Sequence, residues 1–143
     1  MFFFRFLSVP LTLSAVGVPG NVQSCATDFT CEQTCGPLND PSSTNFVIYD
    51  LGSVQTLSYI ELKVKQDVGL KVRAFTVDHD YLCYDYTLEG APSNVETEHI
   101  TNGCYGKKAK FIRVETSAVG STLDLCYLRY HLLGIDYFVC HSL

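Results

Sequence analysis

Four charged side chains near the middle of the sequence could bind a polar ligand. They are Lys65, Asp67, Lys71 and Arg73. Ammonium and guanidinium groups donate hydrogen bonds to ligand oxygens, and the planar guanidinium gives those bonds a fixed direction. The same four residues would also suit a solvated, charged face of two strands that binds nothing. The sequence leaves both interpretations open.

The acidic, tyrosine-rich segment DHDYLCYDYTLEG follows these residues. Asp78 and Asp80 stand at alternate positions and are candidate calcium ligands, although no Gly-bearing calcium-loop pattern accompanies them. The rings of Tyr81 and Tyr84 suit stacking on the apolar face of a sugar. The alternative is an ordinary sandwich loop with a short strand in it. Apart from calcium, we expect no metal and no cofactor.

No pattern in the sequence indicates catalysis. Covalent catalysis needs a nucleophile beside an oriented base, and neither a Gly-x-Ser-x-Gly elbow nor a comparable motif occurs. Cys31, Cys35 and the Cys140-His141 pair lack the spacing of a zinc site. We therefore expect a protein that is not an enzyme.

The composition argues against two classes of partner. The 143-residue chain has a formal net charge of −5, whereas nucleic-acid binding needs a basic face. No cluster of Lys and Arg suits an anionic membrane surface either. The length is that of one domain.

Residues 1–24 have the features of a secretory signal peptide. Arg5 lies near the start, an apolar run covers Phe6–Val18, and small residues precede Cys25. Cleavage before Cys25 or after Gly20 would fit this pattern. The apolar run is shorter than the roughly 20 residues that a membrane span needs. We predict a secreted, extracellular protein without a membrane span.

Seven cysteines also fit an oxidising compartment. They stand at positions 25, 31, 35, 83, 104, 126 and 140. An odd number leaves one thiol without a partner in the chain, so an oligomer could form through it.

The stretch from Phe46 to Asp67 predicts the centre of the fold. Phe46–Leu51 is apolar, aromatic and β-branched, as in a buried strand, and Gly52 with Ser53 should end it. Ile60, Leu62 and Val64 then alternate with charged residues, which predicts a second strand with one dry face. Two such paired strands need a further sheet to cover them.

Further strands are expected over residues 70–77, 109–115 and 123–133, with a brief one over 95–100. On the strand over 123–133, the face with Cys126 should point inward and His131 should lie at the surface. Turn residues separate these strands, and no segment has the pattern of a helix. We predict a Cys-rich loop over 25–45, a β-sandwich over 46–134 and a tail over 135–143.

Three motifs resemble the fucolectin branch of the galactose-binding-like jelly rolls, relatives of the discoidin and coagulation-factor C-type domains. The first is YDLGSVQTLSYIELKVKQD, which begins at Tyr49. The second is CYGKKAKFI, which begins at Cys104, and the third is TLDLCYL, which begins at Thr122. Their order and spacing carry the resemblance over about residues 35–134. It implies an all-β, antiparallel jelly-roll β-sandwich linked by disulfides.

The resemblance also implies which cysteines pair. A cysteine before the first motif would bond the one in the closing strand, here Cys35 with Cys126. The middle-loop cysteine would bond the one before the basic-aromatic strand, here Cys83 with Cys104. Either Cys25 or Cys31 would then bond Cys140, or Cys25 and Cys31 would close a small ring.

The family holds sugar hydroxyls with a histidine after the first cysteine and with two basic residues near an Arg-x-Asp motif. Here Lys65-Gln66-Asp67 stands at that motif with Lys71 and Arg73 beyond it, and Gly36-Pro37 follows the first cysteine. The resemblance implies a non-catalytic, lectin-like module for fucose- or galactose-type carbohydrate. The alternative is a structural or protein-interaction module that kept the fold and lost the sugar site, so the partner is a glycan or an extracellular protein.

Overall fold

The computed structural model describes residues 5–8, 12–13, 23–24, 35–134 and 137–142, and side chains are described for 35–134. All regular elements in these ranges are strands, and among them no helix is long and apolar enough to cross a membrane. The expectation of an all-β, antiparallel sandwich is confirmed.

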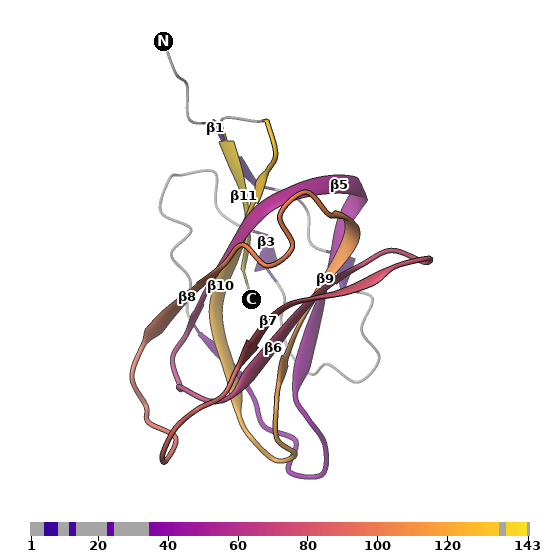
Figure 1. The fold of residues 1–143 in the computed structure, drawn as a ribbon. Coiled ribbons are helices and arrows are strands. Elements are labelled where there is room, and N and C mark those ends of the chain that lie inside the picture. Colours follow the sequence, from indigo (N-terminus) through magenta and orange to yellow (C-terminus); the bar gives the residue numbers. More distant parts are fainter. Residues whose placement is uncertain (1–4, 9–11, 14–22, 25–34, 135–136, 143) are drawn as a thin grey trace.

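The strands form two layers that face each other (Figure 1). The first layer, which we call sheet A, contains β1 (Arg5–Ser8), β3 (Gln23–Ser24), β4 (Gly36–Leu38), β8 (Thr97–Thr101), β10 (Leu123–Leu132) and β11 (Tyr137–Ser142). The second layer, sheet B, contains β2 (Thr12–Leu13), β6 (Leu70–Phe75), β7 (Asp80–Tyr86) and β9 (Lys108–Thr116). Every described pairing is antiparallel except β1 with β11.

Strand β5 (Phe46–Val64) belongs to both layers. Its first half pairs with β9 in sheet B, and its second half pairs with β10 and β8 in sheet A. The expectation of two separate, paired strands is therefore wrong, because one continuous strand crosses between the layers. Gly52, with a φ of 85°, lies where the pairing with β9 shifts register. A bulge there bends the strand, as a positive-φ glycine allows.

The core lies between the sheets and is built by the alternation seen in the sequence. Ile60, Leu62 and Val64 are all buried, as expected for the dry face of β5. Each such side chain contributes about 1.5–3 kcal/mol when it leaves water. The largest fully buried side chains are Tyr49, Tyr130, Leu57, Ile60, Leu62, Leu70, Ile112, Leu123, Leu125, Leu128 and Val47.

Among residues 35–134, two disulfides fasten the sandwich, and both were implied by the family resemblance. Cys35 bonds Cys126 across 91 residues, and Cys83 bonds Cys104 across 21 residues. The second bond joins β7 of sheet B to the turn that follows β8 of sheet A. Gly103 allows this approach, because a Cβ there would meet the carbonyl oxygen of Cys83 at 2.0 Å.

Several predicted boundaries differ from the structure. The tyrosine-rich segment, expected to be mainly loop, forms the seven-residue strand β7. The segment expected as a tail over 135–143 contains β11, which pairs with β10. Cys25 and Cys31 lie outside the described residues, as does the side chain of Cys140. Cleavage of residues 1–24 stays a prediction.

Candidate ligand-binding site

Loops from both layers gather at the lower end of the sandwich in Figure 1. They are the connections over residues 39–45, 65–69, 87–96 and 117–122. Backbone hydrogen bonds tie them together, since the amide of Gly120 donates to the Ser43 carbonyl at 2.9 Å and that of Ser117 to the Gly69 carbonyl at 2.9 Å. The Asn45 side chain adds a bond to the Ser121 carbonyl at 2.6 Å. This rim is therefore a fixed platform.

A pocket of about 460 Å³ opens between these loops. We call it the rim pocket; it is lined by Val68, Gly69, Lys71, Asp85, Thr87, Leu88, Gly90, Pro92, Ser117, Ala118 and Ser121. Part of this wall is apolar, and the rest offers an ammonium group, a carboxylate and three hydroxyls. Such a mixture suits a polyhydroxylated ring, whose faces are apolar and whose edge both donates and accepts hydrogen bonds.

Lys71 and Asp85 are the charged residues of the rim pocket, and the sheet places them together. They are partners in the register of β6 and β7, and both point away from the core. Among residues 35–134, no ion pair is formed by Lys71. The pair thus offers a donor and an acceptor that a ligand can use.

Gly69 lies where two of the loops approach each other at the rim pocket. A Cβ at this position would lie 3.2 Å from both the Cβ and the Oγ of Ser117 and 3.3 Å from the carbonyl oxygen of Tyr86. A side chain there would push apart the loops that meet at the pocket.

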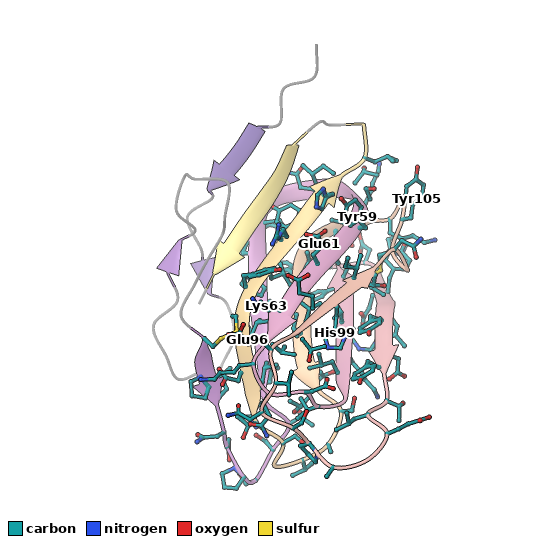
Figure 2. The ribbon with its side chains drawn as sticks, turned by 90° about the vertical axis from the view of Figure 1, so that its left-hand side faces the viewer. Tyr59, Glu61, Lys63, Glu96, His99 and Tyr105 are labelled. Carbon is teal, nitrogen blue, oxygen red and sulfur yellow. A yellow bond between two sulfur atoms is a disulfide. The ribbon has the colours of Figure 1, made fainter. Side chains whose placement is uncertain are left out.

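A buried polar cluster lies behind the rim, between the free edges of the two sheets. We call it the histidine cluster: Asp67, Tyr84, Tyr86 and His99. The hydroxyl of Tyr84 and the Nδ1 of His99 share a hydrogen bond of 2.9 Å, and the Tyr86 hydroxyl donates to Asp67 at 3.3 Å. The Asp67 carboxylate lies 3.7 Å from the Nε2 of His99. His99 itself points inward from β8 (Figure 2).

Burial controls the protonation of this cluster. It lowers the pKa of His99 below the ordinary value of 6.5, and the Asp67 carboxylate offsets only part of that effect. Burial likewise raises the pKa of Tyr84, with smaller contributions from Tyr86 and Asp67. His99 is 6% exposed, so its ring is enclosed in the fold behind the rim pocket.

The structure does not bring all the predicted site residues together. Lys71 lines the rim pocket, whereas Asp67 and Tyr84 belong to the histidine cluster behind it. Lys65 is exposed outside the pocket, and its amide donates to the Asp124 carbonyl at 2.8 Å. Arg73 lies further along β6, on the open face of sheet B.

Tyr81 and the two candidate calcium ligands lie at the far end of β7 from the rim. The Lys107 ammonium sits 4.9 Å from the centre of the Tyr81 ring. Asp80 faces Arg73 at 3.6 Å, and the amide of Asp78 donates to the Thr76 hydroxyl at 3.2 Å.

One group of three potential metal ligands exists among the described residues, and it lies elsewhere. It contains Cys35, Cys126 and Glu96. The two sulfurs are joined to each other, so they are not the thiolates that a metal needs.

Two parts of the site were not predicted from the sequence. Ser117 and its neighbours lie almost 50 residues from Lys71, and only the pairing of β6 with β9 brings them to the pocket. The only sequence feature that indicates a buried His99 is weak: it is the middle residue of a short strand, Thr97–Thr101, whose side chains alternate between the two faces. Its partners Asp67 and Tyr84 come from distant segments, which no local pattern reveals.

The chain is similar to solved structures in its fold. No family model matches the chain, and no curated protein does. The module "CpGH89CBM32-6" of Clostridium perfringens superposes with a TM-score of 0.56 at 8% identity, covering 85% of this chain and 91% of that one.

Two further structures align less well. A fucolectin from the serum of Morone saxatilis (striped bass) has a TM-score of 0.49 at 14% identity, covering 76% of this chain and 35% of that one. The Streptococcus pneumoniae fucose-binding module SpX-3 has a TM-score of 0.46 at 16% identity, covering 64% and 67%. With two sheets, a closing strand and both disulfides in place, the chain has a galactose-binding-like, discoidin-type β-sandwich fold.

Proposed function

We propose that the chain is a secreted, non-catalytic carbohydrate-binding module that takes a sugar ring in the rim pocket. The observation that carries this proposal is the pairing of Lys71 with Asp85 in a pocket whose remaining wall is apolar or hydroxyl-bearing. The ligand class is suggested by the Clostridium perfringens CBM32 module, which shares the fold.

The side chains of the rim pocket have distinct roles in this proposal. The Lys71 ammonium donates to a ring or hydroxyl oxygen, and the Asp85 carboxylate accepts from a neighbouring hydroxyl. Val68, Leu88 and Pro92 cover the apolar face of the ring. A fucose- or galactose-type sugar is the first candidate, and the disulfides support an extracellular setting.

The test is titration of the purified chain with fucose, galactose and short galacto-oligosaccharides, with and without calcium. Lys71→Met and Asp85→Asn should each weaken sugar binding by about tenfold or more, because each removes a charge-assisted hydrogen bond. Lys108→Gln, which removes an exposed cation outside the pocket, is the matched control and should leave the affinity unchanged. Binding that ignores both pocket variants, or no binding to any sugar, would overturn the proposal.

A protein-binding module is the second candidate. It is favoured by the position of Lys65 and Arg73 outside the rim pocket and by the absence of an aromatic ring among the rim-pocket residues. The same titration separates the two candidates, since a module that has lost its sugar site would bind none of these carbohydrates.

A further inference from the structure

The outer face of sheet B carries a second hollow, of about 350 Å³, which we call the face depression. It is lined by Arg73, Phe75, Asp80, Arg113 and Glu115. Strands β6 and β9 place the two arginines directly opposite each other, and Phe75 opposite Phe111 in the next pair on the same face. Like charges facing each other across a sheet are destabilising. Two guanidinium groups brought together in this way are suited to an anionic ligand, which would lie between them.

The face depression is richer in hydrogen-bond donors than in acceptors. Each guanidinium carries five N–H groups. The Nη2 of Arg113 donates to Glu115 at 3.0 Å, and its Nε is buried, so a ligand can reach only the Nη groups of this side chain, which is 31% exposed. Arg73 lies 3.6 Å from Asp80, beyond hydrogen-bond length, and the Asp80 side chain is 60% exposed. A ligand group rich in acceptor oxygens would fill the donors that remain.

Aromatic rings hold and border these donors. The Arg113 guanidinium lies 4.1 Å from the centre of the Phe46 ring, which fixes its plane. Phe75 and Phe111 stack with ring centres 5.1 Å apart, beside the arginines. The Lys110 ammonium, 5.3 Å from the centre of the Phe111 ring, adds a third cation. A sugar ring carrying an anionic group could rest on the phenylalanines and meet the two guanidinium groups.

The face depression adjoins the rim pocket. Lys71 of the pocket and Arg73 of the depression are two residues apart on β6, on the same face, which is a separation of roughly 7 Å along a strand. Lys71 is also the register partner of Glu115. A single extended ligand could therefore touch both hollows.

We propose that the face depression is a second subsite that binds a carboxylate- or sulfate-bearing sugar through Arg73 and Arg113. The ligand of this chain is then an acidic oligosaccharide that runs from the rim pocket across β6 and β9. This inference rests on the proposed carbohydrate function and adds the charge and the minimum length of the ligand.

The test compares three probes on the full chain by titration calorimetry: a tetragalacturonate, a heparin-derived tetrasaccharide and a neutral galactotetraose. The double variant Arg73→Gln/Arg113→Gln should weaken the favoured acidic probe by about tenfold or more, because hydrogen bonds to charged groups are lost. Its affinity for the neutral probe should not change. Wild-type binding of the acidic probe should also weaken as salt rises.

Two further variants separate charge from geometry and from folding. Arg73→Lys/Arg113→Lys keeps the charge but loses the paired donors, and should recover only part of the affinity. Lys65→Gln/Lys108→Gln removes the same charge from exposed sites outside both hollows, and should bind the acidic probes like the wild type.

The outcomes also distinguish this inference from the proposed function. If the wild type binds the neutral probe and neither acidic one, the second subsite is overturned and the rim pocket stands. Equal losses for acidic and neutral probes in Arg73→Gln/Arg113→Gln would also overturn it. If no probe binds at all, the carbohydrate function fails together with this inference. A preference for tetragalacturonate assigns a carboxylate to the subsite, and a preference for the heparin probe assigns a sulfate.

Discussion

The outer faces of the two sheets use similar side chains in opposite ways. On sheet A, Arg129 pairs with Glu61 at 3.1 Å, each with a side chain 21% exposed, and its guanidinium lies 4.4 Å from the centre of the Tyr127 ring. The Tyr127 hydroxyl donates in turn to Glu98 at 2.7 Å. Figure 2 shows this polar surface along β5, where Glu61 lies between Tyr59 and Lys63.

On sheet B, Arg73 is held more loosely. Arg73 and Asp80 are 3.6 Å apart, with side chains 33% and 60% exposed. Arg113, in contrast, bonds Glu115 at 3.0 Å, and its guanidinium lies 4.1 Å from the centre of the Phe46 ring. The contacts of Arg129 and Arg113 stabilise the fold, whereas the loosely held Arg73 keeps donors that a ligand can reach. This difference can be measured.

Removal of the Cys35–Cys126 disulfide should have the largest effect on stability, because this bond anchors β10 at the centre of sheet A. Cys35→Ser/Cys126→Ser should lower the free energy of unfolding by about 2–5 kcal/mol, measured by chemical denaturation. Cys83→Ser/Cys104→Ser is the comparison. It should lower the free energy of unfolding by less, because the cysteines of this disulfide are 21 residues apart in the sequence and those of the other are 91 residues apart. The reverse order of losses would contradict the view that sheet A holds the structure together.

A matched pair of arginine variants tests the two faces directly. Arg129→Met should lower the free energy of unfolding by about 1–3 kcal/mol, because it leaves the half-buried Glu61 with only His131 of the described residues, 3.8 Å away, and uncovers Tyr127. Arg73→Met should change it by less than about 0.5 kcal/mol, as expected for a loose, exposed ion pair. If both variants lowered the free energy of unfolding equally in the same denaturant series, Arg129 and Arg73 would not differ in their contribution to stability.

The smallest effect is expected at the histidine cluster, between the sheets. Because burial lowers the pKa of His99 below 6.5, its contribution to stability is complete above pH 6.5 and is lost as the pH falls below that value. Melting temperatures of the wild type should therefore fall from pH 7 to pH 5. His99→Gln, which cannot gain a proton, should show a shallower fall; an identical pH dependence would mean that His99 does not titrate as described.

The sequence predicted the layers well, because each strand with one dry face carries its own signal. Ile60, Leu62 and Val64 are buried as their spacing indicates. Strand β7 was expected to be mainly loop because its tyrosines are neither clearly polar nor clearly apolar. Tyr84 and Tyr86 turn out to pack against the core, where the sheet gives their hydroxyls partners.

The site was harder to foresee than the fold. Lys71 was identified from its charge, but its partners in the rim pocket come from three separate loops. The pairing of Arg73 with Arg113 depends on the register between β6 and β9, which no short motif specifies. The side chain of His131, expected at the surface, is only 18% exposed, because it stacks on the Tyr59 ring of the neighbouring β5 with centres 3.8 Å apart.

The Cys83–Cys104 bond turns residues 84–103 into a closed ring whose ends cannot move apart. The loop over 87–96, which supplies Leu88, Gly90 and Pro92 to the rim pocket, is carried inside that ring. Insertions there cost only a closure entropy that grows slowly with length. The loop can therefore vary in length and sequence while the frame stays constant, which makes it the natural place for selection, or an engineer, to change what the molecule recognises.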